Sequence, residues 1–535
     1  MYRRYLFLIA AVFLSMQGCS SDTNSNGSTA TGAVSVSLTD APAFGYDHVW
    51  VTVRELWLHT SDVAEPEHHG WVKYPLASPV TFDLLELGNG VISVPIWDNI
   101  GVPEGEYTQI RVFLARTEAP LTASANANGL SFNNQVDVTD DASHYPLRVP
   151  DAGRGIMLTG QFSVKKNEKL KLAIDFDAGH DVVKIEHGAK TEYILKPRLA
   201  YFDLLNAGAI VGSIDSQATG SNPSARFVIK AEQVAPNGLV HVVRRVTVLS
   251  PDQSGRFVLF PLLPGTYDVV IRGINYQTVI IKGVPVTRDT KPDLNPTRIP
   301  MVTMTPSTVL DHPLDVTIES PTGAWAHFLQ TLPGEGEKPY EIRFRHFNPL
   351  TGRIIGFPLS SDPLRVGAYV DEHTPVTLGT VSPVGGNGSY TAVAAAPLHD
   401  LELSKDLVTT TTTTLSFGTL NVIAPLADRT VSGSIIVPET FAPGFLDRGI
   451  LFACHGGMIV NAISVDSQMA SGGTYTISNL PGGTPMLPLP RAYYGIEAIG
   501  WSSGNPANRA VAMPRFVDLR TADATDVDLN MSMLP

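Results

Sequence analysis

Short runs in which apolar and polar residues alternate constrain the fold of this 535-residue chain more than any other feature. Side chains two positions apart lie on the same face of a β-strand, so each run predicts a half-buried strand. Turn signals rich in Gly, Pro and Asn separate the runs, and residues 81–87 are the best short helix candidate. The pattern predicts an all-β chain of tandem antiparallel β-sandwich domains. The clearest runs lie at residues 34–38, 49–58, 110–114 and 170–176.

The N-terminus has the composition of a secretory signal peptide, which we place at residues 1–18. Two arginines precede an apolar run of 12 residues, Tyr5 to Met16. This run is too short for a transmembrane helix, which needs about 20 apolar residues. Gly18 followed by Cys19 resembles the lipobox of bacterial lipoproteins. The resemblance implies that Cys19 carries a lipid.

We therefore expect a lipid anchor to hold the protein at a membrane. Each buried methylene of an acyl chain contributes about 0.8 kcal/mol, and the lipoprotein modification carries more than one chain. Residues 19–32 are rich in Ser, Thr, Asn and Gly, which is typical of a flexible tether. Ser20 stands where Asp would favour retention in the inner membrane. The resemblance thus implies the outer membrane of a Gram-negative bacterium, and leaves the periplasmic or surface face open.

Charge and cysteine content exclude several classes of function. The net charge is −13 and no run of Lys or Arg occurs, which argues against nucleic acid and anionic lipid headgroups as partners. Only two cysteines exist, and with Cys19 assigned to lipid there is no disulfide framework. Cys454 ends an apolar run, so we expect a buried, unreactive thiol.

Residues 33–205 contain a series of separated motifs. In this order they resemble an uncharacterised domain family of bacterial lipoproteins, a domain of unknown function. The resemblance implies an exported β-sandwich-like domain without an established activity. The motifs are SVSLTDAP at 35–42, FDLL at 82–85, PEGEYTQIR at 103–111, DFDA at 175–178 and LKP at 195–197.

Two later stretches share another pattern, in which a glycine precedes an aromatic residue, an apolar residue and a leucine. It occurs at residues 255–265 and again at 473–483. Pro264-Gly265 predicts a tight turn within the first copy. The pattern resembles the carboxypeptidase regulatory-like module, a prealbumin-type sandwich with a carbohydrate-binding-like fold. We assign such modules to residues 206–302 and 429–535.

The stretch between these modules, residues 303–428, holds a weaker copy of the pattern at Gly388 to Ala392. We predict one further β-sandwich there. Thr409 to Thr414 is expected to form a β-branched edge strand, because an apolar pattern continues after it.

Two groups of side chains could bind a divalent cation. Glu67, His68 and His69 lie near Glu65 in a predicted hairpin loop, and a solvated loop is the preferred interpretation. Asp175 and Asp177 are two positions apart on one strand face, so paired carboxylates could bind calcium. Hydrogen bonding to the backbone at a strand end is the competing interpretation.

Evidence for catalysis is weak. Residues 500–504 match the G-x-S-x-G pattern around Ser502, but Asn505-Pro506 follows where a nucleophile elbow needs a helix. A loop is therefore the preferred interpretation. Haem, phosphate-loop and zinc-protease motifs do not occur, and we expect no cofactor.

Tryptophans and tyrosines offer another possible binding surface, because flat rings stack on sugars. Trp50 and Trp57 are seven positions apart, so they face opposite sides of a regular strand unless a bulge intervenes. Core packing is the competing interpretation for these rings and for Trp71, Trp97, Tyr493, Tyr494 and Trp501.

The sequence as a whole predicts a lipid-anchored, non-catalytic cell-envelope protein with a binding or structural role. Its sandwiches would form a rigid stalk and recognition surface that contacts a glycan or another envelope protein. A cation-dependent adhesive module using Asp175 and Asp177 and a hydrolase using Ser502 are the alternative functions.

Overall fold

The computed structural model describes most of the chain after the tether. Cys19, the signal peptide and most of the predicted tether lie outside the described residues. The helices among the described residues are short, and none is long and apolar enough to cross a membrane. The described residues are 30–41, 45–62, 64–139, 141–150, 152–187, 190–197, 199–215, 227–249, 255–334, 336–442, 444–483, 492–505 and 508–533.

The first unit is a β-sandwich of two sheets around one large apolar core. One sheet has the order β12-β9-β1-β4, and the other has the order β10-β11-β7-β6-β2-β5-β8 with β3 paired to β2. The elements are β1 (Thr31–Asp40), β2 (Tyr46–His59), β3 (Val72–Asp83), η1 (Leu84–Leu87), β4 (Trp97–Pro103), β5 (Gly105–Leu114), α1 (Ala123–Ala127), β6 (Gln135–Val138), β7 (His144–Arg148), β8 (Ile156–Val164), β9 (Lys169–Phe176), α2 (Ala178–Asp181), β10 (Val182–His187), β11 (Lys190–Leu195) and β12 (Ala200–Asp203).

The alternating runs of the sequence form the core strands of this sandwich. Val34, Val36 and Leu38 are at most 1% exposed. β1 starts at Thr31, two residues before the predicted start of the domain at residue 33. The predicted helix at residues 81–87 is wrong in its first half, because β3 continues to Asp83. Only Leu84–Leu87 turns into a 3₁₀-helix, which the side chain of Asp83 caps by accepting from the Leu85 amide.

A β-bulge in β2 decides which way its tryptophans face. The register of β2 shifts between Val53 and Glu55 against both β3 and β5. Val51 and Val53 before the bulge, and Leu56 and Leu58 after it, all belong to the apolar core. The extra residue therefore places Trp50 and Trp57 on the same, outer face of the sheet, where a regular strand would separate them.

The second unit is a sandwich that borrows strands from the next stretch of chain. Its sheets have the orders β16-β13-β19 and β15-β14-β17-β18-β24-β25. β24 and β25 come from within residues 303–428, and β24 pairs parallel to β18. The elements are β13 (Gly208–Ser213), β14 (Phe227–Val234), β15 (His241–Leu249), β16 (Arg256–Leu262), β17 (Gly265–Gly273), β18 (Val279–Val286), β19 (Thr297–Arg298), β24 (Leu364–Ala368) and β25 (Gly379–Val381).

The predicted turn at Pro264-Gly265 connects β16 to β17. These strands belong to different sheets, so the chain passes at this turn from one sheet of the sandwich to the other. Phe257 and Leu259 of β16 are fully buried in that core.

The third unit is a smaller sandwich with sheet orders β23-β20-β28 and β22-β21-β26-β27. The predicted strand at Thr409 to Thr414 is wrong except for its last residue. Residues 409–413 lie between β27 and β28, where the chain passes from one sheet to the other. The elements are β20 (His312–Ser320), β21 (Trp325–Gln330), β22 (Tyr340–His346), β23 (Arg353–Leu359), β26 (Ser389–Ala395), β27 (Glu402–Val408) and β28 (Thr414–Thr419).

The fourth unit has one seven-stranded sheet, with the order β31-β30-β33-β34-β35-β29-β32. Its core includes Val431, Leu451, Tyr475 and Ile496. The elements are β29 (Ala427–Ile436), β30 (Arg448–His455), β31 (Met458–Ser464), α4 (Asp466–Ser471), β32 (Gly473–Gly482), β33 (Tyr493–Trp501), β34 (Arg509–Asp518) and β35 (Leu529–Met533).

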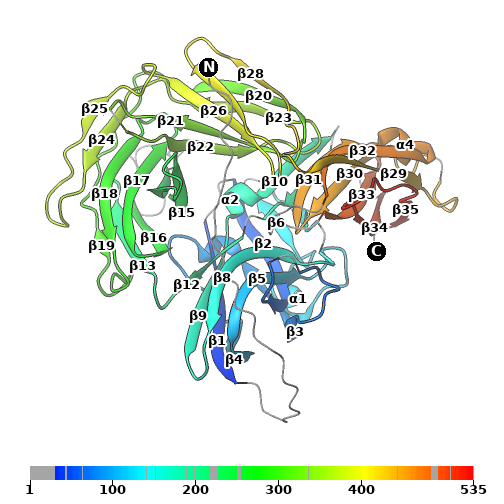
Figure 1. Ribbon diagram of the computed structural model, residues 1–535. Coiled ribbons are helices and arrows are strands. Elements are labelled where there is room, and N and C mark those ends of the chain that lie inside the picture. The colour runs from blue at the N-terminus through cyan, green and yellow to red at the C-terminus, as the bar shows by residue number, and fades with distance from the viewer. Residues whose placement is uncertain are drawn as a thin grey trace.

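The four units do not form a straight stalk. Figure 1 shows the second and third units (green to yellow) arching over the first (blue to cyan), with the fourth (orange to red) beside the first. Arg245 of the second unit binds Asp175 of the first, and Lys196 of the first donates to the Gly323 carbonyl of the third. A separate apolar cluster joins Ile185 of the first unit to Phe452 of the fourth. The first unit therefore touches all three others.

Candidate functional site

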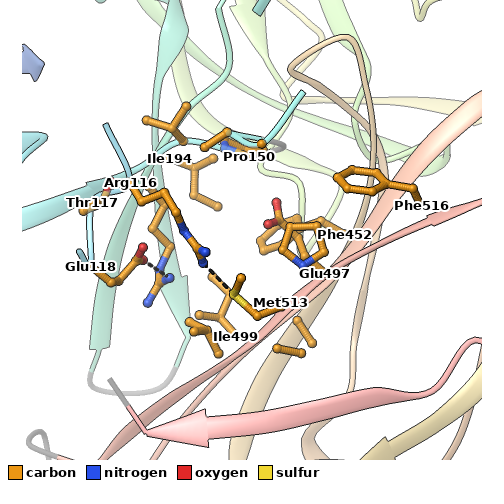
Figure 2. Close-up of a pocket in the computed structure, with 18 residues that line it drawn as sticks. Arg116, Thr117, Glu118, Pro150, Ile194, Phe452, Glu497, Ile499, Met513 and Phe516 are labelled. Atoms are coloured by element: carbon orange, nitrogen blue, oxygen red, sulfur yellow. Dashed lines mark hydrogen bonds and ion pairs between the residues drawn. The ribbon is translucent and has the colours of Figure 1, made fainter. Parts of the chain in front are cut away.

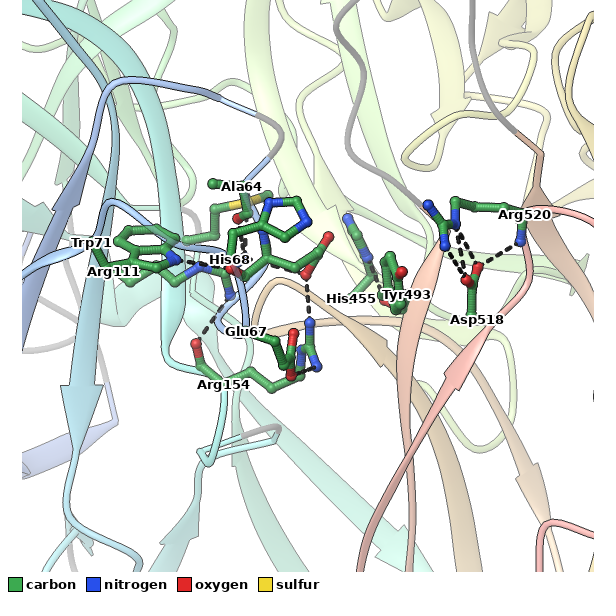
Figure 3. Close-up of polar contacts among 12 residues, drawn as sticks. Ala64, Glu67, His68, Trp71, Arg111, Arg154, His455, Tyr493, Asp518 and Arg520 are labelled. Carbon is green, nitrogen blue, oxygen red and sulfur yellow. Dashed lines mark hydrogen bonds and ion pairs between the residues drawn. The ribbon is translucent and has the colours of Figure 1, made fainter. Parts of the chain in front are cut away.

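The seam between the first and fourth units contains several of the residues that the sequence singled out. A network of arginines and glutamates lies on its first-unit side (Figure 3). Arg111 of β5 donates to the carbonyls of Arg154 at 3.0 Å and Ala64 at 3.2 Å. Arg154 binds the carboxylate of Glu65, and it binds Glu67 at 2.9 Å. Because Arg111, Arg154 and Glu65 are nearly fully buried, these contacts fix the β2–β3 loop onto the sheet.

The predicted metal ligands in this loop have other partners. Glu67 is paired with Arg154, and the His68 ring accepts a hydrogen bond from the Glu65 amide at 3.2 Å. At His69 the backbone carbonyl, not the ring, bonds to the His59 ring at 2.9 Å. Within the part of the chain that the structure describes, no three His, Cys, Asp or Glu residues are grouped so that they could hold a metal ion.

The other predicted carboxylate pair lies at the junction with the second unit. Asp175 is at the end of β9, and Asp177 follows just after that strand. Asp175 forms an ion pair with Arg245, whose side chain is 1% exposed. Burial raises the pKa of Asp175 to about 6, against the opposing attraction of Arg245. Asp175 thus joins two units in this structure.

The arginines of this network contact aromatic rings of both units. Trp57 packs against Trp71, with ring centroids 5.6 Å apart, and the Arg111 guanidinium lies over Trp71. Across the seam, the Tyr493 ring is approached by Arg154 at 5.7 Å and by Arg520 at 4.9 Å. Trp57, Trp71 and Tyr493 are half-buried and lie outside the apolar cores, so the core interpretation does not describe them. Trp97, Tyr494 and Trp501 do belong to apolar clusters.

The hairpin of β30 and β31 in the fourth unit contacts the first unit. Gly456 and Gly457 at its tip have φ of 59° and 88°, which a two-residue turn of this kind requires. The carbonyl of Gly456 accepts from the Met157 amide of β8 at 3.1 Å. A Cβ on Gly456 would lie 3.0 Å from Met157, so glycine also permits the close approach. Burial lowers the pKa of His455 beside the tip, which keeps the imidazole neutral at pH 7.

A cavity of 170 Å³ lies farther along the same seam. Figure 2 shows its walls, with residues of the first unit on one side and of the fourth on the other. Ile194, Phe452 and Ile499 supply apolar surface. The charged groups are Arg116, Glu118, Arg148 and Glu497.

Ion pairs stabilise the arginine wall of this cavity. Arg148 binds Glu118 at 2.5 Å and lies 3.4 Å from Glu192. Arg509 of the fourth unit also binds Glu192, at 2.5 Å and 2.7 Å to the two oxygens. The second terminal nitrogen of Arg148 is buried without a hydrogen-bond partner among the described residues. The cavity thus combines an apolar wall with an available donor, which suits binding of a small amphipathic group.

Two side chains that the sequence singled out as possible nucleophiles, Cys454 and Ser502, belong to the fourth unit. The thiol of Cys454 is fully buried, as expected, and lies 3.7 Å from a Glu497 oxygen. Ser502 follows β33 in a loop, also as expected, and its hydroxyl accepts from the amides of Gly504 and Asn505. β34 comes next in the chain, so the helix that a nucleophile elbow requires does not follow Ser502.

Sequence reasoning missed the buried arginines that fix a loop within the first unit (Arg111) and lie at the junctions of the second unit with the first and third (Arg245 and Arg272). Arg111, Arg245 and Arg272 are each 2% exposed. Each occurs inside a strand that is otherwise mostly apolar, as in QIRVFL of β5. A long cation at such a position must find a partner on another element, and this signal could have indicated an interface.

The first unit is similar to a known domain family. Residues 31–197 match a family model described as "Domain of unknown function (DUF4382)". A search of curated proteins gives no match.

Solved structures align over much of the chain at low similarity. Two B repeat units of the collagen binding protein of Staphylococcus aureus align at 7% identity and a TM-score of 0.13, covering 95% of this chain and 99% of that one. A streptococcal ancillary pilin aligns at 9% identity and a TM-score of 0.13, covering 61% and 99%. The major pilin SpaD of Corynebacterium diphtheriae aligns at 11% identity and a TM-score of 0.14, covering 62% and 97%.

Proposed function

We propose that this protein is a lipid-anchored, non-catalytic binding protein of the bacterial cell envelope, and that its four units act as one body. The observation that carries the proposal is the cavity at the seam, which is built jointly by the first and fourth units. Its apolar wall and charged rim suit a ligand or a side chain of an envelope partner. Lipid on Cys19 would keep this body at the outer membrane.

The cell-envelope part of the proposal rests on the signal peptide and the Gly18-Cys19 pair. We expect Cys19→Ser to move the protein from the membrane fraction to the soluble fraction, because the anchor's apolar area is lost. Cys454→Ser is the matched control, since that thiol is buried in the fourth unit. If Cys19→Ser stayed in the membrane fraction while folding normally, the lipid anchor would be refuted.

The binding part is tested by filling the cavity. Val511 lines it and Val370 is 67% exposed elsewhere, so Val511→Phe and Val370→Phe form a matched pair. We expect a glycan array or a cross-linking capture of envelope proteins to give a signal that Val511→Phe loses and Val370→Phe keeps. Equal signals from both variants, at unchanged melting temperature, would place the binding surface elsewhere.

The two alternative functions gain no support from the geometry. A cation-dependent adhesive module would need Asp175 as a ligand, yet this carboxylate is paired with Arg245. A hydrolase would need Ser502 activated by a base, and the hydroxyl instead accepts from loop amides.

A further inference from the structure

A second cavity, of 150 Å³, lies where the first, second and third units meet. Its floor is the face of the second unit's sheet that carries Lys230 of β14 and Arg272 of β17. Its roof includes Arg343 and Arg345 of β22 in the third unit. Asp177 and Gly179 of the first unit complete the wall. Because three units contribute, the cavity exists only when they are assembled.

The charged residues that line this junction cavity are mostly basic. Two of the four cations have an acidic partner beside the cavity: Lys230 binds Glu341 at 2.8 Å and Arg272 binds Asp311 at 2.5 Å. Among the described residues, Arg343 and Arg345 make no ion pair, and Arg343 lies 4.5 Å from the Phe357 ring centroid. Asp177 is the acidic member of the lining. The cavity therefore has more positive than negative charge.

Arg272 also has hydrogen-bond donors that no described residue satisfies. Its side chain is 1% exposed, and only one terminal nitrogen reaches Asp311. Its other terminal nitrogen and its Nε are buried without a hydrogen-bond partner among the described residues. Unpaired donors of a buried guanidinium cost free energy, and an acceptor in the cavity would satisfy them.

Arg343 is held in an unfavourable electrostatic setting. Its pKa falls to about 9, because burial and the positive charge of Arg272 both disfavour its cationic form. An anion bound between the two guanidinium groups would reverse both effects.

We propose that the junction cavity binds a small tetrahedral oxyanion, phosphate or sulfate, either free or as the terminal group of a larger ligand. Arg272 and Arg343 hold the oxyanion, and Arg345, which is exposed, attracts it at the entrance. Planar guanidinium groups match the oxygen geometry of such anions and keep their charge throughout the physiological pH range. The site does not depend on the lipid anchor.

The test is calorimetric titration of the whole protein with inorganic phosphate, with sulfate and with phenyl phosphate, at constant ionic strength set by chloride. We expect saturable binding that weakens about tenfold or more in Arg343→Gln. Arg345→Gln, at an exposed position, is expected to weaken binding without affecting the fold. Arg288→Gln is the control, because that side chain is 72% exposed in the second unit.

The relative affinities of the three probes identify the form of the anion, and a lack of binding overturns the site. Tighter binding of phenyl phosphate would identify the terminal group of a larger ligand, and tighter binding of phosphate or sulfate would identify a free anion. No saturable binding of any of the three probes, or equal binding by wild type, Arg343→Gln and Arg345→Gln, would overturn the site. Loss of membrane attachment in Cys19→Ser would leave it intact.

Discussion

Arg245 of the second unit forms a buried ion pair with Asp175 of the first. The same guanidinium donates to the Thr39 hydroxyl at 2.9 Å and to the Asp40 carbonyl at 3.2 Å. One side chain thus ties β15 to both β1 and β9. The carboxylate that could have been a calcium ligand is used to join two domains.

Removing one partner of this ion pair is expected to lower the free energy of unfolding more than removing the other. Arg245→Met leaves the buried carboxylate of Asp175 without its cation, so we expect a loss of about 3–5 kcal/mol in unfolding free energy. Asp175→Asn should cost less, because burial already disfavours this carboxylate and raises its pKa to about 6. Chemical denaturation measures both variants, with the exposed Arg288→Met as control. Equal effects for the two variants would contradict a charge-driven junction.

A buried carboxyl group at the contact between the second and third units makes the stability of the protein depend on pH. Glu232 is fully buried and accepts from the Glu341 amide at 3.1 Å. Burial raises its pKa to about 8, despite the opposing attraction of Lys230. The folded state therefore binds a proton that the unfolded state releases near its ordinary pKa of about 4.3. This group's contribution to stability is full at low pH and is lost as the pH rises through about 8.

Glu232→Gln should remove this dependence. We expect the stability of the variant relative to wild type to increase steadily from pH 5 to about pH 8 and to level off above it, measured by urea unfolding. Glu372→Gln, at a site 47% exposed, is the control and should follow wild type. A constant difference between Glu232→Gln and wild type across this range would show that the carboxyl is ionised in the fold.

The close contact between the third and fourth units can be tested by adding a methyl group at Gly323. A Cβ on Gly323 would lie 2.4 Å from the backbone oxygens of Ile459 and Val460 in β31. Gly323→Ala should therefore separate the units locally and cost about 1–3 kcal/mol, as overpacking does. Gly418→Ala in the same unit meets its nearest atom at 4.0 Å and is the matched control. Equal melting temperatures for both variants would mean that these units do not touch as described.

The sequence predicted the fold class because strand alternation is local. Val34, Val36 and Leu38 are buried on one side as their spacing requires. The bulge after Val53 could not be predicted, since it depends on pairing with both β3 and β5. The threonine run at residues 409–413 shows the same limit, because β-branched composition favours a strand while the change of sheet requires a connection.

The candidate site was only partly predictable. Glu65, Glu67 and the aromatic residues were found by composition, but their partners Arg111 and Arg154 are distant in sequence. The seam arises from contacts between the two ends of the chain, such as Glu192 with Arg509. A sequence pattern of period two describes one strand and carries no information on which domain will lie against it.

The central claim is that the four units form one body around the first, and small-angle X-ray scattering of the protein in solution tests it most directly. A compact body of about 500 residues has a radius of gyration of about 23 Å, and four sandwiches in a row would give roughly 40 Å. We predict a value close to the compact limit and a single-body distance distribution. A value near that of the extended row would contradict the account.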